Sequence, residues 1–209
     1  MKLYYSPGAC SLAPHIALRE AERAFDLERV DLRSHRTATG LDFLTINPKG
    51  YVPALQMDGE VLTEGAAILQ YIADLVPERG LAPPAGTFAR YHLQEWLSFI
   101  SSELHKQLSP LWSPDTPVPT QERLRGKVGD RYVYLADRLA DRAYLMGETF
   151  TVADAYLFAI LRWSERFDLD LQIWPNLDEY FQRVMQRSAV QAAMTAEGLI
   201  EPKRVRRSA

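Results

Sequence analysis

A segment rich in proline and glycine divides this chain into two halves with different sequence patterns. Residues 77–87 hold three prolines and two glycines, a composition typical of a linker. Strand and helix signals alternate before this segment, and only helical spacing follows it. The sequence therefore predicts a small α/β domain at 1–78, a linker at 79–86, an all-helical domain at 87–202 and a basic tail at 203–209.

The first half is expected to form a mixed sheet covered by helices. Short apolar or aromatic runs predict four strands, at 2–5, 27–32, 52–56 and 60–62. Asp58-Gly59, between the last two runs, is a strong hairpin signal. Helical spacing predicts three helices, at 11–23, 41–46 and 68–76. The order β-α-β-α-β-β-α combines a crossover with a hairpin, so the four strands should form one mixed sheet.

Apolar side chains recur at helical spacing through the second half. Leu93, Leu97 and Leu104 belong to one such stripe, and further helices are predicted at 128–139, 153–166 and 177–187. Thr151 and Asp154 resemble a capping box, with Asp in place of the usual Glu or Gln, before the most apolar helix. We interpret this pair as structural, because it fixes where that helix begins.

Composition and charge argue against several classes of function. The chain has 209 residues, a net charge of −3 and one cysteine. It cannot form an internal disulfide, and it lacks the basic footprint of a protein whose main partner is nucleic acid. No window approaches 18 uninterrupted apolar residues, and the histidines lack zinc-like spacing. We expect a cytoplasmic protein without a metal or a membrane span, ending in a solvated basic tail.

Cys10 follows a Ser-Pro-Gly-Ala turn and precedes a predicted helix. The backbone N–H groups and the dipole of a helix N-terminus stabilise a thiolate, which is the reactive form of cysteine. A structural cysteine would suit the same position, since free cysteine is among the most buried residue types. Position alone does not choose between a reactive thiol and a structural one.

Two further turns could present backbone groups to a ligand. A cis bond at Val52-Pro53 would turn the Val52 N–H and C=O outward to pair with a peptide, although a trans bond in an edge strand is favoured when the pair is taken alone. Glu64-Gly65 begins the third helix, where N–H groups bind carboxylates and Glu64 could accept an ammonium group. Taken alone, Glu64 is better explained as a favourable acid in a first helical turn, with Thr63 as the N-cap.

His105 lies one residue beyond the apolar stripe, late on the long helix. This position could place its side chain in a groove between the two halves. The alternative is a surface histidine near a helix C-terminus, where the helix dipole favours it.

The order of these signals resembles the glutathione transferase family, and the details resemble its bacterial beta class. The matching stretches cover essentially the whole chain except the basic tail: MKLYYSPGACSLAPHIAL, NPKGYVPAL, LTEGAAILQYIA, SELHK, FTVADAYLFAILRW and AEGLI. The resemblance implies a thioredoxin-like first domain and a homodimer. It also implies glutathione as a co-substrate, with no bound cofactor, whose thiol is conjugated to small hydrophobic electrophiles in detoxification.

The same resemblance assigns roles to individual residues. Cys10 faces the glutathione sulfur and can form a mixed disulfide with it, and His105 polarises the site, so these two are the expected catalytic residues. The backbone of Val52 pairs with the cysteinyl part of glutathione beside a cis Pro53. The remaining expected glutathione contacts are Glu64 and Gly65 at the γ-glutamyl end, His35 at the glycyl end, and Ser98, Ser102, Glu103, His105 and Lys106 from the helical domain.

This chain departs from the beta class at two of these positions. His35 stands where the class often has a lysine that would contact the glycyl carboxylate, and Ser98 stands where it often has an asparagine. A neutral histidine can still donate a hydrogen bond, and serine can reach through water. We therefore expect the glutathione site to persist.

The electrophile pocket is expected between the domains, lined by residues from both halves such as Tyr5, Pro7, Trp112 and Trp163. Tyr4, Tyr5 and Ser11 are rival groups for activating the glutathione sulfur. Cys10 is preferred because its class motif is complete.

Two other functions compete with conjugation. Cys10 could carry glutathione-dependent thiol–disulfide exchange or reductive dehalogenation. The fold also serves as a binding module without catalysis in stress and translation proteins, but a pure scaffold has no need of Cys10, Glu64 and His105.

Overall fold

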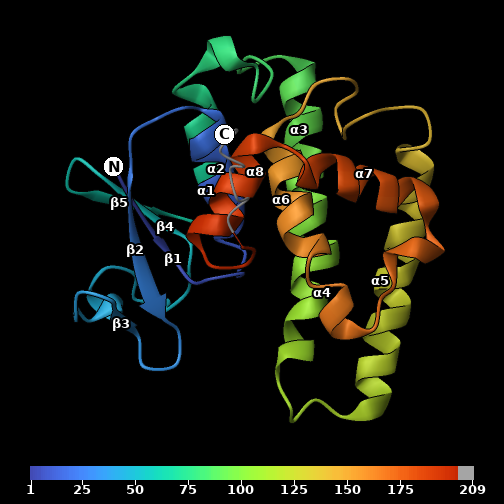
Figure 1. Cartoon of the computed structure of the whole chain (residues 1–209), viewed down its shortest axis with the longest axis horizontal. Coiled ribbons are helices and arrows are strands. Elements are labelled where there is room, and N and C mark those ends of the chain that lie inside the picture. The colour runs from blue at the N-terminus through green and yellow to red at the C-terminus, as the bar shows by residue number, and fades with distance from the viewer. Residues whose placement is uncertain (202–209) are drawn as a thin grey trace, which may run out of the picture.

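The computed structural model describes residues 1–201, and the basic tail expected at 203–209 lies outside them. The N-terminal half is a mixed sheet with helices packed on it, and the C-terminal half is helical (Figure 1). The strands of the N-terminal sheet are β1 Lys2–Tyr5, β2 Asp26–Asp31, β3 Arg36–Thr37, β4 Ala54–Met57 and β5 Glu60–Thr63. They lie in the order β3-β2-β1-β4-β5. The central strand β1 runs parallel to β2 and antiparallel to β4, so the predicted mixed sheet is confirmed.

The sheet has one strand more than the four that the sequence predicts. β3 pairs antiparallel with β2, with Val30 opposite Thr37. Two residues are too few to show an alternating pattern, so this edge strand is hidden in a polar stretch. The predicted helix at 41–46 is a 3₁₀ turn at Phe43–Thr45, capped by Asp42. The three predicted helices are therefore two α-helices and this turn.

The hairpin predicted at Asp58-Gly59 is confirmed. Met57 pairs with Glu60, so the two residues form the whole loop between β4 and β5. Asp58 has φ of +50° and Gly59 has φ of +85°, as a two-residue hairpin turn of this type requires. The register of this hairpin places β4, and the turn before it, beside β1.

The helices are α1 Leu12–Glu20, α2 Gly65–Asp74, α3 Phe88–Phe99, α4 Lys106–Leu108, α5 Val118–Arg138, α6 Val152–Leu161, α7 Pro175–Met185 and α8 Ser188–Ala196. A π-helical segment, Ile100–His105, joins α3 to α4 and interrupts the single long helix that the apolar stripe predicts. The sequence analysis missed α8, a short helix with small side chains. None of the helices within residues 1–201 is long and apolar enough to cross a membrane.

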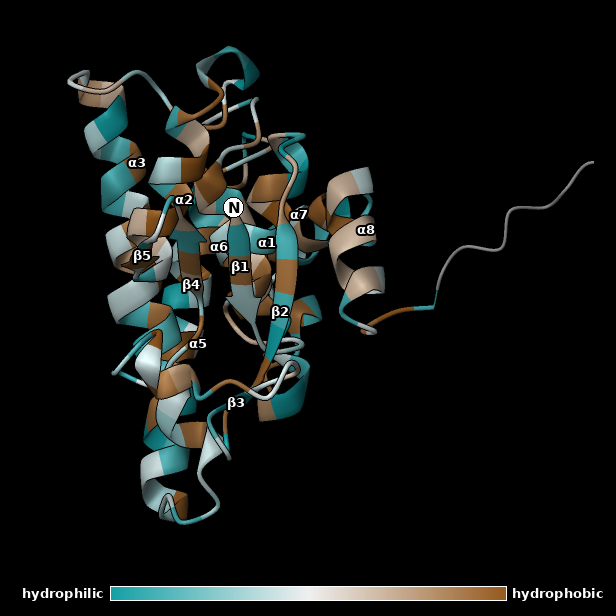
Figure 2. Ribbon diagram, turned by 90° about the vertical axis from the view of Figure 1, so that its left-hand side faces the viewer, coloured by the Kyte–Doolittle hydropathy of each residue, from teal (hydrophilic) through white to brown (hydrophobic). Residues whose placement is uncertain are grey.

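The two halves share one apolar core. α1 packs against both α6 and α8, and α2 packs against α1 and α6. Ile16 of α1, Ile68 of α2 and every residue of α6 are buried. Figure 2 shows α1 and α6 behind the sheet and α8 to one side of it, with hydrophobic residues coloured brown on these helices. The helical half is therefore a structural support for the helix that begins next to Cys10.

The capping box predicted at the start of α6 is confirmed. The buried carboxylate of Asp154 accepts the backbone N–H of Thr151 at 2.8 Å and that of Leu145 at 2.9 Å. The Tyr180 hydroxyl donates to the same carboxylate at 3.1 Å. Burial raises the pKa of Asp154, and these hydrogen bonds act in the opposite direction. The box thus fixes both the start of α6 and the loop that precedes it.

A second buried carboxylate, that of Glu197 just after α8, joins the two halves. It accepts the backbone N–H of Gly8 at 2.9 Å and contacts His15 Nδ1 at 2.8 Å. Arg19 Nε donates to His15 Nε2 at 3.1 Å, so Nε2 is an acceptor and Nδ1 carries the proton that Glu197 accepts. The side chains of His15 and Glu197 are both fully buried. The end of α8 therefore holds both the Gly8 turn and α1.

We predict that Glu197→Gln destabilises the fold by about 1–3 kcal/mol, because a carboxamide has one oxygen for two buried donors and directs its own N–H₂ at one of them. Urea unfolding at pH 7 measures the change. Glu179→Gln, an exposed substitution on α7, is the control and should leave the midpoint unchanged. Equal midpoints for the two variants would contradict the role assigned to Glu197.

Candidate active site

The turn that carries Cys10 is closed by the side chain of Ser11. Ser11 Oγ accepts the backbone N–H of Ser6 at 3.1 Å and donates to the Ser6 carbonyl at 3.3 Å. Ser11 is fully buried, and α1 begins at the next residue. Its hydroxyl, one of the rival activating groups, is thus engaged in shaping the turn.

Cys10 and Val52 come together where the chain enters β4. The Cys10 thiol donates a hydrogen bond to the Val52 carbonyl, with 3.3 Å between Sγ and the oxygen. The Val52-Pro53 peptide bond is cis. The Val52 N–H has no hydrogen-bond partner among residues 1–201. A backbone donor and a backbone acceptor therefore stand together beside the thiol.

The start of α2 adjoins this turn. A Cβ on Gly65 would lie 3.9 Å from Pro53 Cγ, which is ordinary contact. Glu64 is the N-cap, with no capping hydrogen bond from its side chain and a φ of +70°, a strained value for a residue other than glycine. The prediction of Thr63 as N-cap is wrong, because Thr63 is the last residue of β5. The first N–H groups of α2, at Gly65 and Ala66, lack partners in the described part of the chain.

Lys49 and His35 lie on the turn and loop next to these residues. Lys49 Nζ donates to Thr63 Oγ1 at 2.8 Å and forms an ion pair with the Glu64 carboxylate. His35 packs against Gly50, where an added Cβ would lie 2.9 Å from His35 Cε1 and where φ is +72°. His35 Nδ1 is buried, and none of the described residues forms a hydrogen bond with it. This region thus holds a cation and a buried polar atom without a partner.

His105 ends the π-helical segment and faces α6. Its Nδ1 lies 2.8 Å from the Tyr156 hydroxyl, and its ring meets Trp163 edge-on with the centroids 5.1 Å apart. Burial, with a smaller effect of the Lys106 charge, lowers the pKa of His105 to about 4. The ring is therefore neutral at pH 7. The alternative of a surface histidine is wrong, because His105 is half-buried between α6 and its own segment.

The other residues expected from the helical domain lie on a different face of the same segment. Ser98, Ser102 and Lys106, four residues apart, are exposed. Glu103 forms an ion pair with Arg131 of α5 at 2.9 Å. Within residues 1–201, none of these four hydrogen-bonds to Cys10, Val52, Glu64 or Gly65. Of the helical-domain residues on the expected list, His105 is the one that contacts Tyr156 of α6 and Trp163.

Burial determines the protonation state of the Cys10 thiol. Desolvation raises the pKa of Cys10 to about 12, against the opposing effect of its own and Ser11's backbone N–H groups. The negative charge of Glu64 adds a smaller increase. The start of α1 thus acts on the thiolate in the direction expected from the sequence, but the cost of burial outweighs it. Cys10 is a thiol at neutral pH and acts as an S–H donor.

Aromatic rings from the helical half form a wall beside the Gly8 turn. Trp163 Nε1 donates to the Gly8 carbonyl at 2.9 Å. Trp112 meets Trp163 and Phe167 edge-on, with the ring centroids 5.4 and 5.1 Å apart. Trp112 is 44% exposed, so its ring offers apolar surface to solvent. These contacts place both tryptophans expected in the electrophile pocket in one cluster.

The two N-terminal tyrosines fit the role of activating group poorly. The Tyr4 hydroxyl donates to Gln56 Oε1 at 2.9 Å, on the same sheet. Tyr5 packs beside His15, with 6.2 Å between the ring centroids. Burial raises the pKa of both tyrosines, and nearby acids raise it further. Both hydroxyls are therefore protonated at neutral pH.

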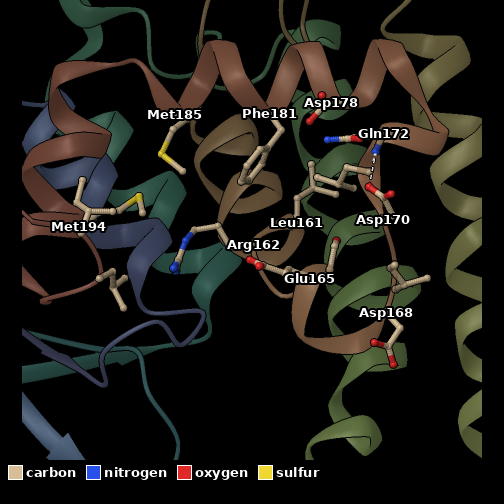
Figure 3. Close-up of a pocket in the computed structure, with 15 residues that line it drawn as sticks. Leu161, Arg162, Glu165, Asp168, Asp170, Gln172, Asp178, Phe181, Met185 and Met194 are labelled. Carbon is tan, nitrogen blue, oxygen red and sulfur yellow. Dashed lines mark hydrogen bonds between the residues drawn. The ribbon is translucent and has the colours of Figure 1, made fainter.

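A separate cavity of about 660 Å³ lies between α7, α8 and the end of α6 (Figure 3). Arg162 and Glu165 line it from the end of α6 and the residues after it, Phe181 from α7 and Met194 from α8. Neither Cys10, Val52, Glu64 nor His105 belongs to its lining. It is therefore distinct from the candidate site. No group of three His, Cys, Asp or Glu side chains among residues 1–201 is arranged to hold a metal ion.

Comparison with known proteins decides what kind of site this is. A model of the glutathione S-transferase N-terminal domain matches residues 1–74, and one of the C-terminal domain matches residues 96–188. The chain belongs to the glutathione S-transferase family. The transferase is 46% identical to glutathione S-transferase GstA of Escherichia coli O157:H7 over 95% of this chain and 100% of that protein.

Solved structures identify the class. The bacterial beta-class glutathione S-transferase of Sphingomonas chungbukensis is 49% identical, with a TM-score of 0.93 over 96% of this chain and 100% of that chain. A sphingomonad glutathione S-transferase solved in complex with glutathione is 48% identical, with the same TM-score and the same coverage of both chains. The transferase is a bacterial beta-class enzyme, and its first domain has the predicted thioredoxin-like fold.

Three contacts near the site belong to residues that the sequence analysis did not single out. Lys49 stands in NPKGYVPAL, Tyr156 in FTVADAYLFAILRW and Glu197 in AEGLI. All three stretches were recognised as matches. A single sequence, however, does not show which side chain of a matching stretch contacts a residue far away along the chain.

The raised pKa of Cys10 predicts that its thiol reacts slowly with alkylating reagents at neutral pH. Iodoacetamide should alkylate Cys10 in the free enzyme at least about tenfold more slowly than it alkylates free glutathione at pH 7.5, because thiolate is the reacting form. The rate should still be rising at pH 10. Mass spectrometry measures it cleanly, since the chain has one cysteine. A rate that levels off near neutral pH would show instead that Cys10 is a thiolate there.

Proposed function

We propose that glutathione lies along the Cys10, Val52 and Glu64 turns with its sulfur beside Cys10, and that the transferase conjugates it to small hydrophobic electrophiles. The observation that carries this proposal is the pair of backbone groups at Val52 next to the Cys10 thiol: an N–H without a partner among residues 1–201, and a C=O that accepts the Cys10 S–H. The cysteinyl residue of glutathione offers the complementary C=O and N–H, so it pairs with Val52 as a short strand. This pairing holds the sulfur at Cys10.

The γ-glutamyl end is assigned to the start of α2. Its carboxylate accepts the N–H groups of Gly65 and Ala66, at the positive end of the helix dipole. Its ammonium group pairs with the Glu64 carboxylate, which is exposed and shared with Lys49. The strained φ of Glu64 supports this assignment, because strained backbone is concentrated at ligand sites.

The glycyl end is assigned to His35 and Lys49. His35 Nδ1 is a buried polar atom in need of a partner, and a carboxylate oxygen supplies one if that nitrogen is protonated. Lys49 adds the positive charge that the class often has at position 35. The departure at His35 is then offset by a lysine fourteen positions later in the chain, within the turn that also supports Gly50.

Conjugation requires the glutathione thiolate. With glutathione bound, the S–H of Cys10 and the ring of neutral His105 stabilise the anionic sulfur by hydrogen bonding. The electrophile approaches from the aromatic cluster of Trp112 and Trp163, with Tyr5 and Pro7 on the opposite wall. This arrangement favours conjugation over thiol–disulfide exchange, in which Cys10 itself would have to be the thiolate that attacks a disulfide.

The enzyme is proposed to act as a homodimer in the cytoplasm. Exposed apolar side chains gather on α3 and α5: Phe88, Tyr91, Val133 and Tyr134. Such a patch marks an interaction surface. The exposed Ser98, Ser102 and Lys106 and the partly buried Glu103 lie on the neighbouring π-helical segment and its flanks. We assign these four residues to the glutathione site of the partner subunit. We also propose the domain limits that the sequence predicts, with the first domain at 1–78, the linker at 79–86 and the helical domain at 87–202.

Cys10→Ala separates conjugation from exchange. The variant should keep conjugation of an aryl halide within about tenfold of the wild-type rate, because loss of one neutral hydrogen bond costs about 0.5–1.5 kcal/mol. Reduction of a mixed disulfide is measured in parallel. A loss of conjugation by more than about a hundredfold would overturn the proposal, since it would mean that Cys10 reacts covalently.

Tyr91→Arg tests the dimer. A buried arginine in the proposed interface should shift sedimentation equilibrium from dimer to monomer and weaken glutathione binding, because the partner's contacts are lost. Ile173→Arg is the matched control: Ile173 is 67% exposed but lies outside α3 and α5. A Tyr91→Arg protein that stays dimeric would exclude this face as the interface.

A further inference from the structure

Tyr156 lies in the middle of α6, and its hydroxyl reaches the site from the core. The side chain is 4% exposed. Its hydroxyl oxygen is 2.8 Å from His105 Nδ1, and the two rings are nearly perpendicular, at 88°. Because every residue of α6 is buried and the Asp154 capping box fixes its start, this hydroxyl is held in place by its helix.

Only one direction of this hydrogen bond satisfies both groups. Among residues 1–201, His105 Nδ1 is the acceptor within hydrogen-bond distance of the Tyr156 hydroxyl, whereas the Ser101 hydroxyl, whose hydrogen bond lowers the pKa of Tyr156, acts on it as a donor. If Nδ1–H donated to the oxygen, the buried phenol proton would have no acceptor, which is costly. If the phenol donates, Nδ1 is the acceptor and the ring carries its proton on Nε2. The second arrangement leaves no buried donor unpaired.

The remaining ring nitrogen, Nε2, has no partner in the described part of the chain, yet it is not fully buried. It is therefore the atom of His105 that a ligand can reach. The charged and titratable groups around Tyr156 are Cys10 and Glu64, which raise its pKa together with burial, whereas the Ser101 hydroxyl acts in the opposite direction. Tyr156 thus remains a phenol, able to donate, throughout the neutral range.

We propose that Tyr156 is a positioning residue that donates to His105 Nδ1 and so holds His105 as the Nε2–H tautomer, a hydrogen-bond donor aimed at the glutathione sulfur. This inference rests on the proposed function, because it takes the sulfur to lie in front of His105. It deepens that function by assigning the direction of proton donation. His105 stabilises the thiolate and does not accept the thiol proton of glutathione, which is lost to solvent.

The tautomer can be measured without glutathione. In ¹⁵N-labelled enzyme at pH 7, long-range ¹H–¹⁵N correlation spectra distinguish a protonated Nε2 from a protonated Nδ1, and His105→Gln assigns the signals. We expect His105 to be in the Nε2–H form and Tyr156→Phe to change its ring ¹⁵N shifts. A wild-type His105 in the Nδ1–H form, or a tautomer signal unaffected by Tyr156→Phe, overturns the proposal.

Kinetics supply the second readout. Tyr156→Phe should lower kcat for aryl halide conjugation about three- to tenfold and change KM for glutathione less than twofold, since the lost interaction acts on the reacting sulfur. Tyr132→Phe is the matched control: it removes another fully buried hydroxyl, bonded to Ser164 at 2.7 Å, and should leave kcat unchanged. An equal loss of kcat in both variants would mean that Tyr156 acts only through stability.

A wrong role for Tyr156 can be distinguished by experiment from a wrong placement of glutathione. Calorimetry of glutathione binding to the wild-type enzyme tests the site itself. If glutathione bound but did not protect Cys10 from alkylation, the placement of the sulfur would be wrong, whereas the tautomer of His105 would still report on Tyr156. The two hypotheses therefore fail by different measurements.

Discussion

The position of the Cys10 turn depends on one buried carboxylate. Glu197 accepts the Gly8 N–H, and Trp163 donates to the Gly8 carbonyl, so both backbone groups of one residue in the turn are held by the helical half. The same carboxylate holds His15 of α1. The N-terminal half supplies the Cys10, Val52 and Glu64 turns of the proposed glutathione site, and the C-terminal half determines where the first of these turns sits. This dependence explains why the domains share a continuous core.

Burial also decides the chemistry of the two principal side chains. A cysteine at a helix start and a histidine near a cleft are both expected to titrate near neutral pH, the first as a thiolate and the second as an imidazolium. Desolvation disfavours either charge, and here it outweighs the backbone dipoles at Cys10 and the solvent access of His105. Both side chains are neutral hydrogen-bonding groups. In the proposed mechanism, the negative charge beside Cys10 and His105 is then that of the glutathione sulfur.

Much of this fold and part of its site could be predicted from the sequence. Local signals succeeded wherever a turn or cap fixes the backbone, as at Asp58-Gly59 and at the Thr151 box. They failed where the outcome depends on tertiary contact. β3 is too short to show a pattern, and α8 is defined by packing against α1. The partners of Glu197 and of His105 lie 182 and 51 positions away, beyond any spacing argument.

The π-helical segment has a further consequence for how this enzyme can change. A π-helical turn holds about one residue more than an α-helical turn. Loss of one residue within Ile100–His105 can therefore be absorbed, because the segment would continue as a regular α-helix and His105 would keep its face toward Tyr156. Loss of one residue from the α-helical turns of α3 would instead rotate everything after it by about 100° and turn His105 away from Tyr156. In evolution, the π-helical segment should therefore tolerate the loss of one residue better than α3 does.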